Sequence, residues 1–204
     1  MAIGRKPNVQ GLCGPDVSLE MKNGKIAVSP GFETSEPGVY AIGDVCADIQ
    51  LAHVAAAQVH MCGKNCRRPH TIRLQSVPSG MYVSLPIVPN CIYTDPRLLP
   101  LALRRRKRAC GGLRCDVVIF PWRKMDVPLS QGEQDGFIRL VFEAYSNTIV
   151  GAQMMCPRAT DMIGEIATAI ANGLTAEQMS FAMRAQPTYN EGIGAAIEDA
   201  LRKA

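Results

Sequence analysis

Apolar positions in the C-terminal half of the chain recur first with a period of two and later with a helical period. Residues 115–120 form a short apolar run typical of a strand, and residues 136–143 alternate between apolar and polar side chains. One face of this alternation carries Ile138, Leu140 and Phe142. Ser146 and Asn147 provide a turn into residues 148–155, so the two flanking segments are predicted to form a β-hairpin.

Three helical segments are predicted after these strands. Residues 162–170 repeat apolar side chains at helical spacing, and Gly173 stands where a C-terminal cap belongs. Residues 175–178 read Thr-Ala-Glu-Gln, which is a capping box for a short helix, and residues 191–201 carry another apolar stripe. Strands followed by helices predict an α+β domain in which an antiparallel sheet is covered by helices on one face.

The N-terminal part has a different pattern. Residues 22–25 read Lys-Asn-Gly-Lys and predict a tight hairpin, and residues 39–42 form a short apolar run that suits a buried strand. Gly43 and Asp44 follow at the carboxyl end of that run, where a carboxylate suits a sugar hydroxyl in an α/β sheet. Residues 51–58 are rich in alanine and are predicted to begin a helix.

Several of these segments also resemble known motifs. Residues 34–44, with Leu51-Ala52-His53 after them, resemble the second flavin-binding motif of the pyridine nucleotide-disulfide oxidoreductases, in the form found in the dihydrolipoyl dehydrogenase branch. Residues 90–96 and 185–191 resemble the opening and closing motifs of the interface (dimerisation) domain of those enzymes. The resemblance therefore predicts a C-terminal fragment of such an enzyme.

The resemblance divides the chain into three parts. Residues 1–57 are expected to be the C-terminal remnant of an α/β region that binds FAD and NAD, residues 58–89 an irregular linker, and residues 90–204 the interface domain. It implies FAD and NAD as cofactors, which this fragment is not expected to retain. It also implies a homodimer and the lipoyl domain of a 2-oxo acid dehydrogenase complex as partner. The family reaction is NAD-dependent oxidation of a protein-bound dihydrolipoyl group.

The resemblance also implies which residues face the flavin. Gly43 and Asp44 belong to the flavin motif, and the helix that begins at Leu51, Ala52 and His53 would direct its backbone N–H groups at the flavin ring. Gly4 and Arg5 resemble the loop that ends the NAD domain, although Arg5 is explained equally well as an exposed basic residue. A structural role alone would also account for His53.

The closing motif departs from the family at its catalytic position. In the family, a histidine takes the proton of the substrate thiol and a glutamate five residues later orients it, and both act at the flavin of the other subunit. In this sequence the position of the histidine holds Gln186, whereas Glu191 is retained. An amide has no usable proton affinity at neutral pH, so thiol deprotonation is expected to be slow.

Other parts of the enzyme have no counterpart in the sequence. There is no G-x-G-x-x-G fingerprint, and the pair Cys110 and Cys115 leads into an interface-domain strand, so it is not interpreted as a redox disulfide. The chain is therefore expected to be inactive alone. A non-catalytic dimerisation module and another disulfide reductase of the same superfamily are the alternative functions.

Composition adds few constraints. The net charge of +4 depends on one run, residues 104–108, which has no interleaved aromatic residues, so nucleic-acid binding is not expected. The eight cysteines have irregular spacing and are expected to be reduced thiols, and Cys62, Cys66 and His70 give no complete metal-ligand set. No segment has the length of a signal peptide or a membrane span, which predicts a cytoplasmic protein.

Two segments match neither a periodic pattern nor the family. Residues 59–85 show no clean helical periodicity, and residues 97–109 replace an acidic, glycine-containing family segment by an apolar and then basic one. Both are expected to lie outside the packed core. In residues 97–109 the family pattern is lost and then recovered at nearly constant length, which is typical of a compensated frame shift, and on this interpretation the basic run has no function.

Overall fold

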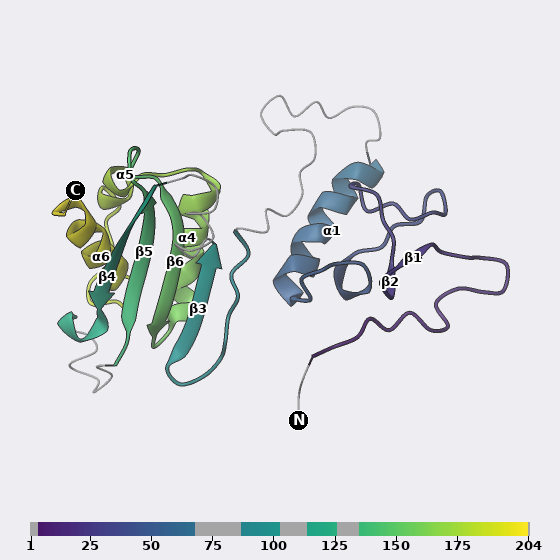
Figure 1. Cartoon of the computed structure of the whole chain (residues 1–204), viewed down its shortest axis with the longest axis horizontal. Helices are drawn as coiled ribbons and strands as arrows, with labels where there is room; N and C mark the ends of the chain where they lie inside the picture. The colour runs from purple at the N-terminus through teal and green to yellow at the C-terminus, as the bar shows by residue number, and fades with distance from the viewer. Residues whose placement is uncertain (1–3, 68–86, 103–113, 126–134, 204) are drawn as a thin grey trace. The chain divides into compact units, whose positions relative to one another are not determined.

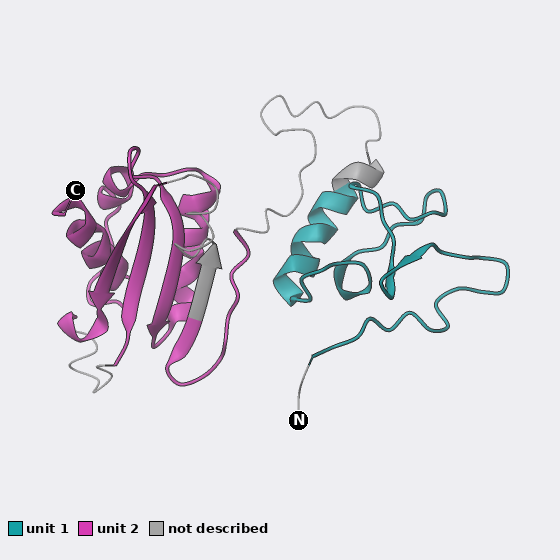
Figure 2. Cartoon of the chain, viewed as in Figure 1, with its two compact units in different colours: residues 1–84 teal, residues 85–204 magenta. Residues whose placement is uncertain are grey.

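The computed structural model describes residues 4–67, 87–102, 114–125 and 135–203. The chain forms two compact units, residues 1–84 and residues 85–204 (Figure 2). We call them the N-terminal unit and the C-terminal unit and describe each by itself. The predicted limits of the three domains remain predictions.

The N-terminal unit contains one hairpin, one 3-10 turn and one helix in its described part (Figure 1). Strands β1 (Met21–Lys22) and β2 (Lys25–Ile26) are antiparallel, and Asn23 and Gly24 between them have φ angles of 53° and 76°. These positive values are what an Asn-Gly turn permits, so the predicted hairpin is confirmed.

The prediction of a strand at residues 39–42 is wrong. This segment makes a single antiparallel bridge, between Tyr40 and Glu33, and has no strand assignment. Hydrogen bonds from Thr34 N to Val39 O and from Ala41 N to Phe32 O join it to the preceding loop. A strand needs a ladder of hydrogen bonds to a neighbour, and the described residues supply only this short pairing. The apolar run in the sequence does not show how many backbone hydrogen bonds the segment can make to a neighbouring strand.

Helix α1 (Ala52–Arg67) begins where the alanine-rich segment predicted it but is longer than expected. The sequence favoured an irregular segment from residue 59, whereas the helix continues through residues 59–67. The reason is that nothing in these nine residues breaks a helix except Gly63, which a helix tolerates at modest cost. Arg67 is the last helical residue in this described stretch. The remainder of the segment, residues 68–85, lies outside the described residues.

The C-terminal unit is built on a four-stranded antiparallel sheet in the order β3-β6-β5-β4. The strands are β3 (Arg97–Ala102), β4 (Cys115–Pro121), β5 (Phe137–Glu143) and β6 (Ile149–Cys156). Strands β5 and β6 form the predicted hairpin, with Asn147 at φ 53° in the turn.

Strand β3 was not predicted. Residues 97–109 were expected outside the core, yet Arg97–Ala102 pairs with β6 along its whole length. A long-range pairing decides this, because β6 has an edge whose backbone groups need partners. Pro100 is compatible with the pairing because β3 is itself an edge strand. The basic run at residues 104–108 lies outside the described residues.

Helices cover one face of this sheet, as predicted (Figure 1). Helix α4 (Ala159–Ala171) packs on β6 and β3, and helix α6 (Glu191–Leu201) packs on β4 and β5. The short helix α5 (Ala176–Ser180) lies against α6 and begins with the predicted capping box of Thr175 and Gln178. The fold is therefore α+β with an antiparallel sheet.

The core lies between the sheet and the two long helices. Its largest fully buried side chains come from β5, β6, α4, α6 and the turn after β4: Trp122, Ile138, Leu140, Ile149, Met154, Met162, Ile166, Ile193 and Ile197. Trp122 belongs to a short 3-10 helix, η3 (Trp122–Lys124), directly after β4. The three apolar residues predicted to share one face of β5 are all buried here, which confirms the period-two interpretation.

We expect Gly192→Ala to destabilise the C-terminal unit. A Cβ at Gly192 would lie 2.6 Å from Trp122 Cζ3 and 3.0 Å from Ile138 Cδ1, so the core would have to move. Overpacking of this kind costs ~1–3 kcal/mol of the free energy of unfolding, more than alanine gains in helix propensity. Urea unfolding of both proteins measures the difference.

Gly164→Ala is the matched control, because Gly164 is an exposed residue in α4 and a Cβ there meets nothing within 4 Å. This variant should be unchanged or slightly more stable. Equal stability of Gly192→Ala and the wild type would contradict the close packing of α6 on Trp122.

Candidate functional site

The turn that carries Gly43 and Asp44 is the 3-10 helix η1 (Gly43–Val45). Gly43 adopts φ 72°, and its amide donates a hydrogen bond of 2.7 Å to Oε1 of Gln58, whose residue is 7% exposed. The carbonyl of Gly43 accepts from the amides of Cys46 and Ala47. A buried amide thus ties η1 to helix α1, which fixes the position of Asp44 relative to the start of that helix.

Asp44 presents a half-buried carboxylate on this turn. Within the residues that the structure describes, its carboxylate oxygens make no hydrogen bond and no ion pair, while its backbone carbonyl accepts from Gln50 Nε2 at 3.4 Å. An ionised carboxylate accepts hydrogen bonds only, so this group fits a hydroxyl donor such as that of a sugar. The arrangement is compatible with the flavin role that the sequence predicts.

The start of helix α1 provides a second polar group beside this turn. The carbonyl of Leu51 accepts from the amides of Val54 and Ala55, and the first helical turn contains no acidic side chain. The first amides of a helix have no partner within the helix, and they attract an electron-rich group. Leu51 is half-buried, whereas Ala52 and His53 are exposed.

Gly4 and Arg5 lie in the segment at the beginning of the described chain, and both residues are exposed. Gly4 has φ 128°, a conformation that favours glycine. No hydrogen bond or ion pair connects Arg5 to Asp44 or to α1 in the described part of the chain. Their assignment to the cofactor site therefore remains a prediction.

Gln186 lies in the loop of residues 181–190, between α5 and α6 in the C-terminal unit. Its side chain is exposed, and the peptide bond between Gln186 and Pro187 is cis. Glu191 begins α6 and accepts a hydrogen bond of 2.7 Å at Oε1 from the amide of Thr188. Within the described residues, no hydrogen bond joins Gln186 and Glu191. Glu191 thus binds the backbone of the loop at Thr188. The catalytic roles of Gln186 and Glu191 stay predictions.

Two structural contributors were missed by the sequence reasoning. Gln58 holds the turn at Gly43, and its signal in the sequence is a lone amide on the buried side of an alanine-rich helix. Arg184, within the loop of Gln186, forms an ion pair with Glu165 of α4, which lies 19 residues earlier in the sequence, and no local motif reveals such a pair.

Three of the described cysteines are buried enough to change the behaviour of their thiols. Burial raises the pKa of Cys156 to about 12, and it raises the pKa of Cys46 and Cys91 above the ordinary thiol value. These groups are therefore protonated at neutral pH and behave as small apolar side chains. Among the described residues there is no cluster of ligands for a metal, and no helix long and apolar enough to cross a membrane.

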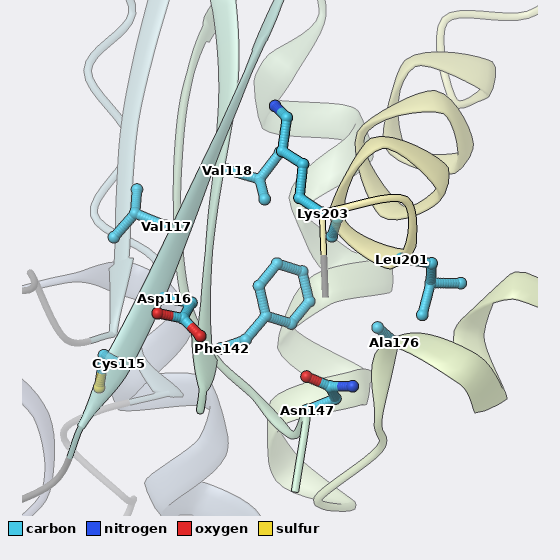
Figure 3. A pocket seen from close by; sticks show the side chains of 10 residues that line it. Cys115, Asp116, Val117, Val118, Phe142, Asn147, Ala176, Leu201 and Lys203 are labelled. Atoms are coloured by element: carbon cyan, nitrogen blue, oxygen red, sulfur yellow. The ribbon is translucent and has the colours of Figure 1, made fainter. Parts of the chain in front are cut away.

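The C-terminal unit also has an open cavity of about 320 Å³ between the beginning of β4 and the end of α6 (Figure 3). Its polar lining includes Asp116, Asn147 and Lys203. Asn147 donates a hydrogen bond of 2.7 Å to Glu177, and Lys203 pairs with Asp199 at 2.7 Å. Because two of these three groups already have protein partners, the cavity is not assigned a ligand.

Comparison with known protein families identifies the family to which this chain belongs. Residues 88–197 match the pyridine nucleotide-disulphide oxidoreductase dimerisation domain, and residues 1–58 match the pyridine nucleotide-disulphide oxidoreductase family. The chain belongs to this family, whose members depend on FAD and NAD, and the resemblance seen in the sequence is confirmed.

The similar curated proteins narrow the resemblance to one branch. The chain is 32% identical to the dihydrolipoyl dehydrogenase of Bacillus subtilis, covering 100% of this chain and 41% of the relative. It is 30% identical to that of Geobacillus stearothermophilus, covering 98% and 41%. The chain thus spans about 40% of the length of these relatives.

Solved structures show the same fold. LpdA from Mycobacterium tuberculosis superimposes with a TM-score of 0.83 at 21% identity, over 98% of this chain and 42% of that protein. The HOCl-induced flavoprotein disulfide reductase RclA from Escherichia coli gives 0.82 at 17% identity, over 97% and 44%.

Proposed function

We propose that this chain supplies part of a flavoprotein disulfide oxidoreductase of the dihydrolipoyl dehydrogenase type, which oxidises protein-bound dihydrolipoamide with NAD via FAD. One observation carries the proposal: a single chain matches both the oxidoreductase family and its dimerisation domain, in that order, and aligns over almost all of its length with dihydrolipoyl dehydrogenases. By the same resemblance the lipoyl domain of a 2-oxo acid complex would be its partner.

The N-terminal unit would contribute one side of the flavin site. Asp44 would accept a hydrogen bond from a hydroxyl of the cofactor, and the first amides of α1 would face its ring. Bound FAD would supply the two-electron chemistry. Gly43 and Gln58 would serve by holding Asp44 in place.

The C-terminal unit would form a homodimer through a surface that includes the loop of Gln186. Phe181 and Met183 in this loop are 85% and 100% exposed, which makes them the two most exposed large apolar side chains in the described part of the chain. A second copy packed on them would remove this area from water. That packing would also bring Gln186 of one subunit toward the flavin of the other.

Gln186 limits the chemistry that this enzyme could perform. An amide can hold a substrate by hydrogen bonds but cannot take the proton of a thiol, and Glu191 already accepts the Thr188 amide. Oxidation of a dithiol would be slow, whereas steps that need no thiol deprotonation would be less affected.

The glutamine at position 186 also favours the second candidate, a non-catalytic dimerisation module. Such a module needs the interface but not the base, and this chain matches the dimerisation domain over residues 88–197 and has glutamine at position 186. A different disulfide reductase is the third candidate, supported by the fold alone through RclA. Dimer formation is common to the first two candidates, and only an activity measurement separates them.

We expect the purified chain to be a dimer that Phe181→Asp combined with Met183→Asp converts to a monomer. Burying two carboxylates in an apolar interface should raise the dissociation constant by about 100-fold or more. Sedimentation equilibrium over a range of concentrations measures this constant.

The matched control is Tyr145→Asp, which places a carboxylate at an 84% exposed aromatic residue in the turn between β5 and β6. This variant should remain dimeric. A monomeric wild type, or a double variant that dimerises as tightly as the wild type, would contradict the proposed interface.

A chimera tests the catalytic part of the proposal. When residues 1–204 replace the corresponding C-terminal part of a close relative, Gln186→His should raise the dihydrolipoamide oxidation rate by ~10²–10⁴-fold, the usual value of general-base catalysis. Electron transfer from NADH to an artificial acceptor should change little, because no thiol is deprotonated.

The control is Gln186→Asn, which keeps an amide and should leave the dihydrolipoamide rate low. The protein must be folded, dimeric and flavin-loaded in each case. If Gln186→His left the dihydrolipoamide rate unchanged, position 186 would not be the base position. A chimera inactive in both assays would favour the dimerisation module.

A further inference from the structure

The loop of residues 181–190 is held to helix α4 by one carboxylate. Glu165 of α4 accepts at Oε1 from Arg184 Nε at 3.0 Å and from Arg184 Nη2 at 2.5 Å. The arginine side chain is 10% exposed and the glutamate side chain 23% exposed, so this ion pair is largely removed from water. Charge-assisted bonds in such a position are stronger and more directional than surface pairs.

The other oxygen of the same carboxylate binds the far side of the loop. Asn190 Nδ2 donates to Glu165 Oε2 at 2.9 Å. Glu165 therefore connects a residue two positions before Gln186 with a residue four positions after it. We call Glu165, Arg184 and Asn190 the clamp.

The remaining donors of Arg184 are also used. Nη1 donates to the carbonyl of Ala182 at 3.1 Å, and Nη2 lies 3.4 Å from the carbonyl of Met179. Gly194 of α6 gives the guanidinium room, since a Cβ there would lie 3.3 Å from Arg184 Nη1. A planar group with this many fixed partners holds the backbone on one side of Gln186 in a single position.

An aromatic stack fixes the other end of the loop. The rings of Tyr189 and Trp122 are 5.8 Å apart with an interplanar angle of 10°, and the guanidinium of Arg158 lies 5.3 Å from the Tyr189 ring centroid. Trp122 is fully buried, so Tyr189 is anchored to the core. Thr188 adds a bond of 2.6 Å from its hydroxyl to the carbonyl of Ala185.

Between these anchors the three residues Ala185, Gln186 and Pro187 are exposed. We propose that Arg184, acting through Glu165, is a positioning residue: the clamp holds the exposed segment 185–187 in one conformation so that Gln186 is presented at a fixed place. Its importance for a substrate rests on the proposed function, because only there does Gln186 face the flavin of a second subunit.

The test uses the full chain and its single tryptophan. Trp122 stacks on the loop, so quenching of its fluorescence by acrylamide reports whether the loop is docked. Cleavage within residues 181–190 by proteinase K, mapped by mass spectrometry, gives a second readout of the same segment. Both are repeated in the Phe181→Asp/Met183→Asp background, where a dimer interface cannot shield the loop.

Glu165→Gln keeps the shape of the side chain but removes its charge. It should increase cleavage at residues 185–187 by about ten-fold and increase quenching of Trp122, since an opening equilibrium shifts by about this factor when a charge-assisted bond is lost. Arg184→Lys keeps the charge but not the planar fork, so its effect should be smaller. Glu198→Gln, which breaks an exposed pair with Arg202 on α6, should change neither readout.

Unchanged cleavage and quenching in a folded Glu165→Gln variant would overturn the proposal. If this variant does not fold, Arg184→Lys decides alone, and wild-type behaviour of both readouts would have the same meaning. Unfolding of both variants would assign the pair to global stability and would also contradict a positioning role. Neither readout requires flavin or a second copy, so failure of the clamp and failure of the proposed function are distinguishable.

Discussion

The close contact between Gly192 and Trp122 is the constraint on which the C-terminal unit depends. Helix α6 approaches the sheet so closely at this point that a Cβ would lie 2.6 Å from the indole ring. The loop of Gln186 ends where α6 begins, and Tyr189 of that loop stacks on the same indole. The packing of one helix on the core therefore also determines where the loop lies, so the fold and the candidate site share one anchor.

Local patterns in the sequence predicted those parts of the fold that short-range physics decides. The Asn-Gly hairpin, the alternation of β5 and the capping box at Thr175 were all confirmed because each depends on residues within a few positions. The two wrong strand predictions concern segments whose structure depends on pairing with residues far away in the sequence. Strand β3 exists because β6 offers an open edge, whereas residues 39–42 make only the single bridge between Tyr40 and Glu33 within the described part of the chain.

The candidate site was predictable to the extent that it lies in continuous motifs. Gly43, Asp44 and the start of α1 lie together in the N-terminal unit, as the motif implied. The residues that support the site were not predictable. Gln58 reaches back across 15 positions to hold the turn, and Glu165 reaches across 19 to hold Arg184. Such partners have no fixed spacing, since tertiary packing alone brings them together.

The central claim is that one copy of the chain presents Gln186 to the flavin side of another. A photo-crosslinking amino acid at position 186, in a mixture of isotopically light and heavy chains, tests this claim most directly. Mass spectrometry then identifies both the linked residues and the chains they come from. The account predicts links from position 186 to residues 43–53 of a different chain. Links confined to the same chain, or to other regions of a second copy, would contradict it.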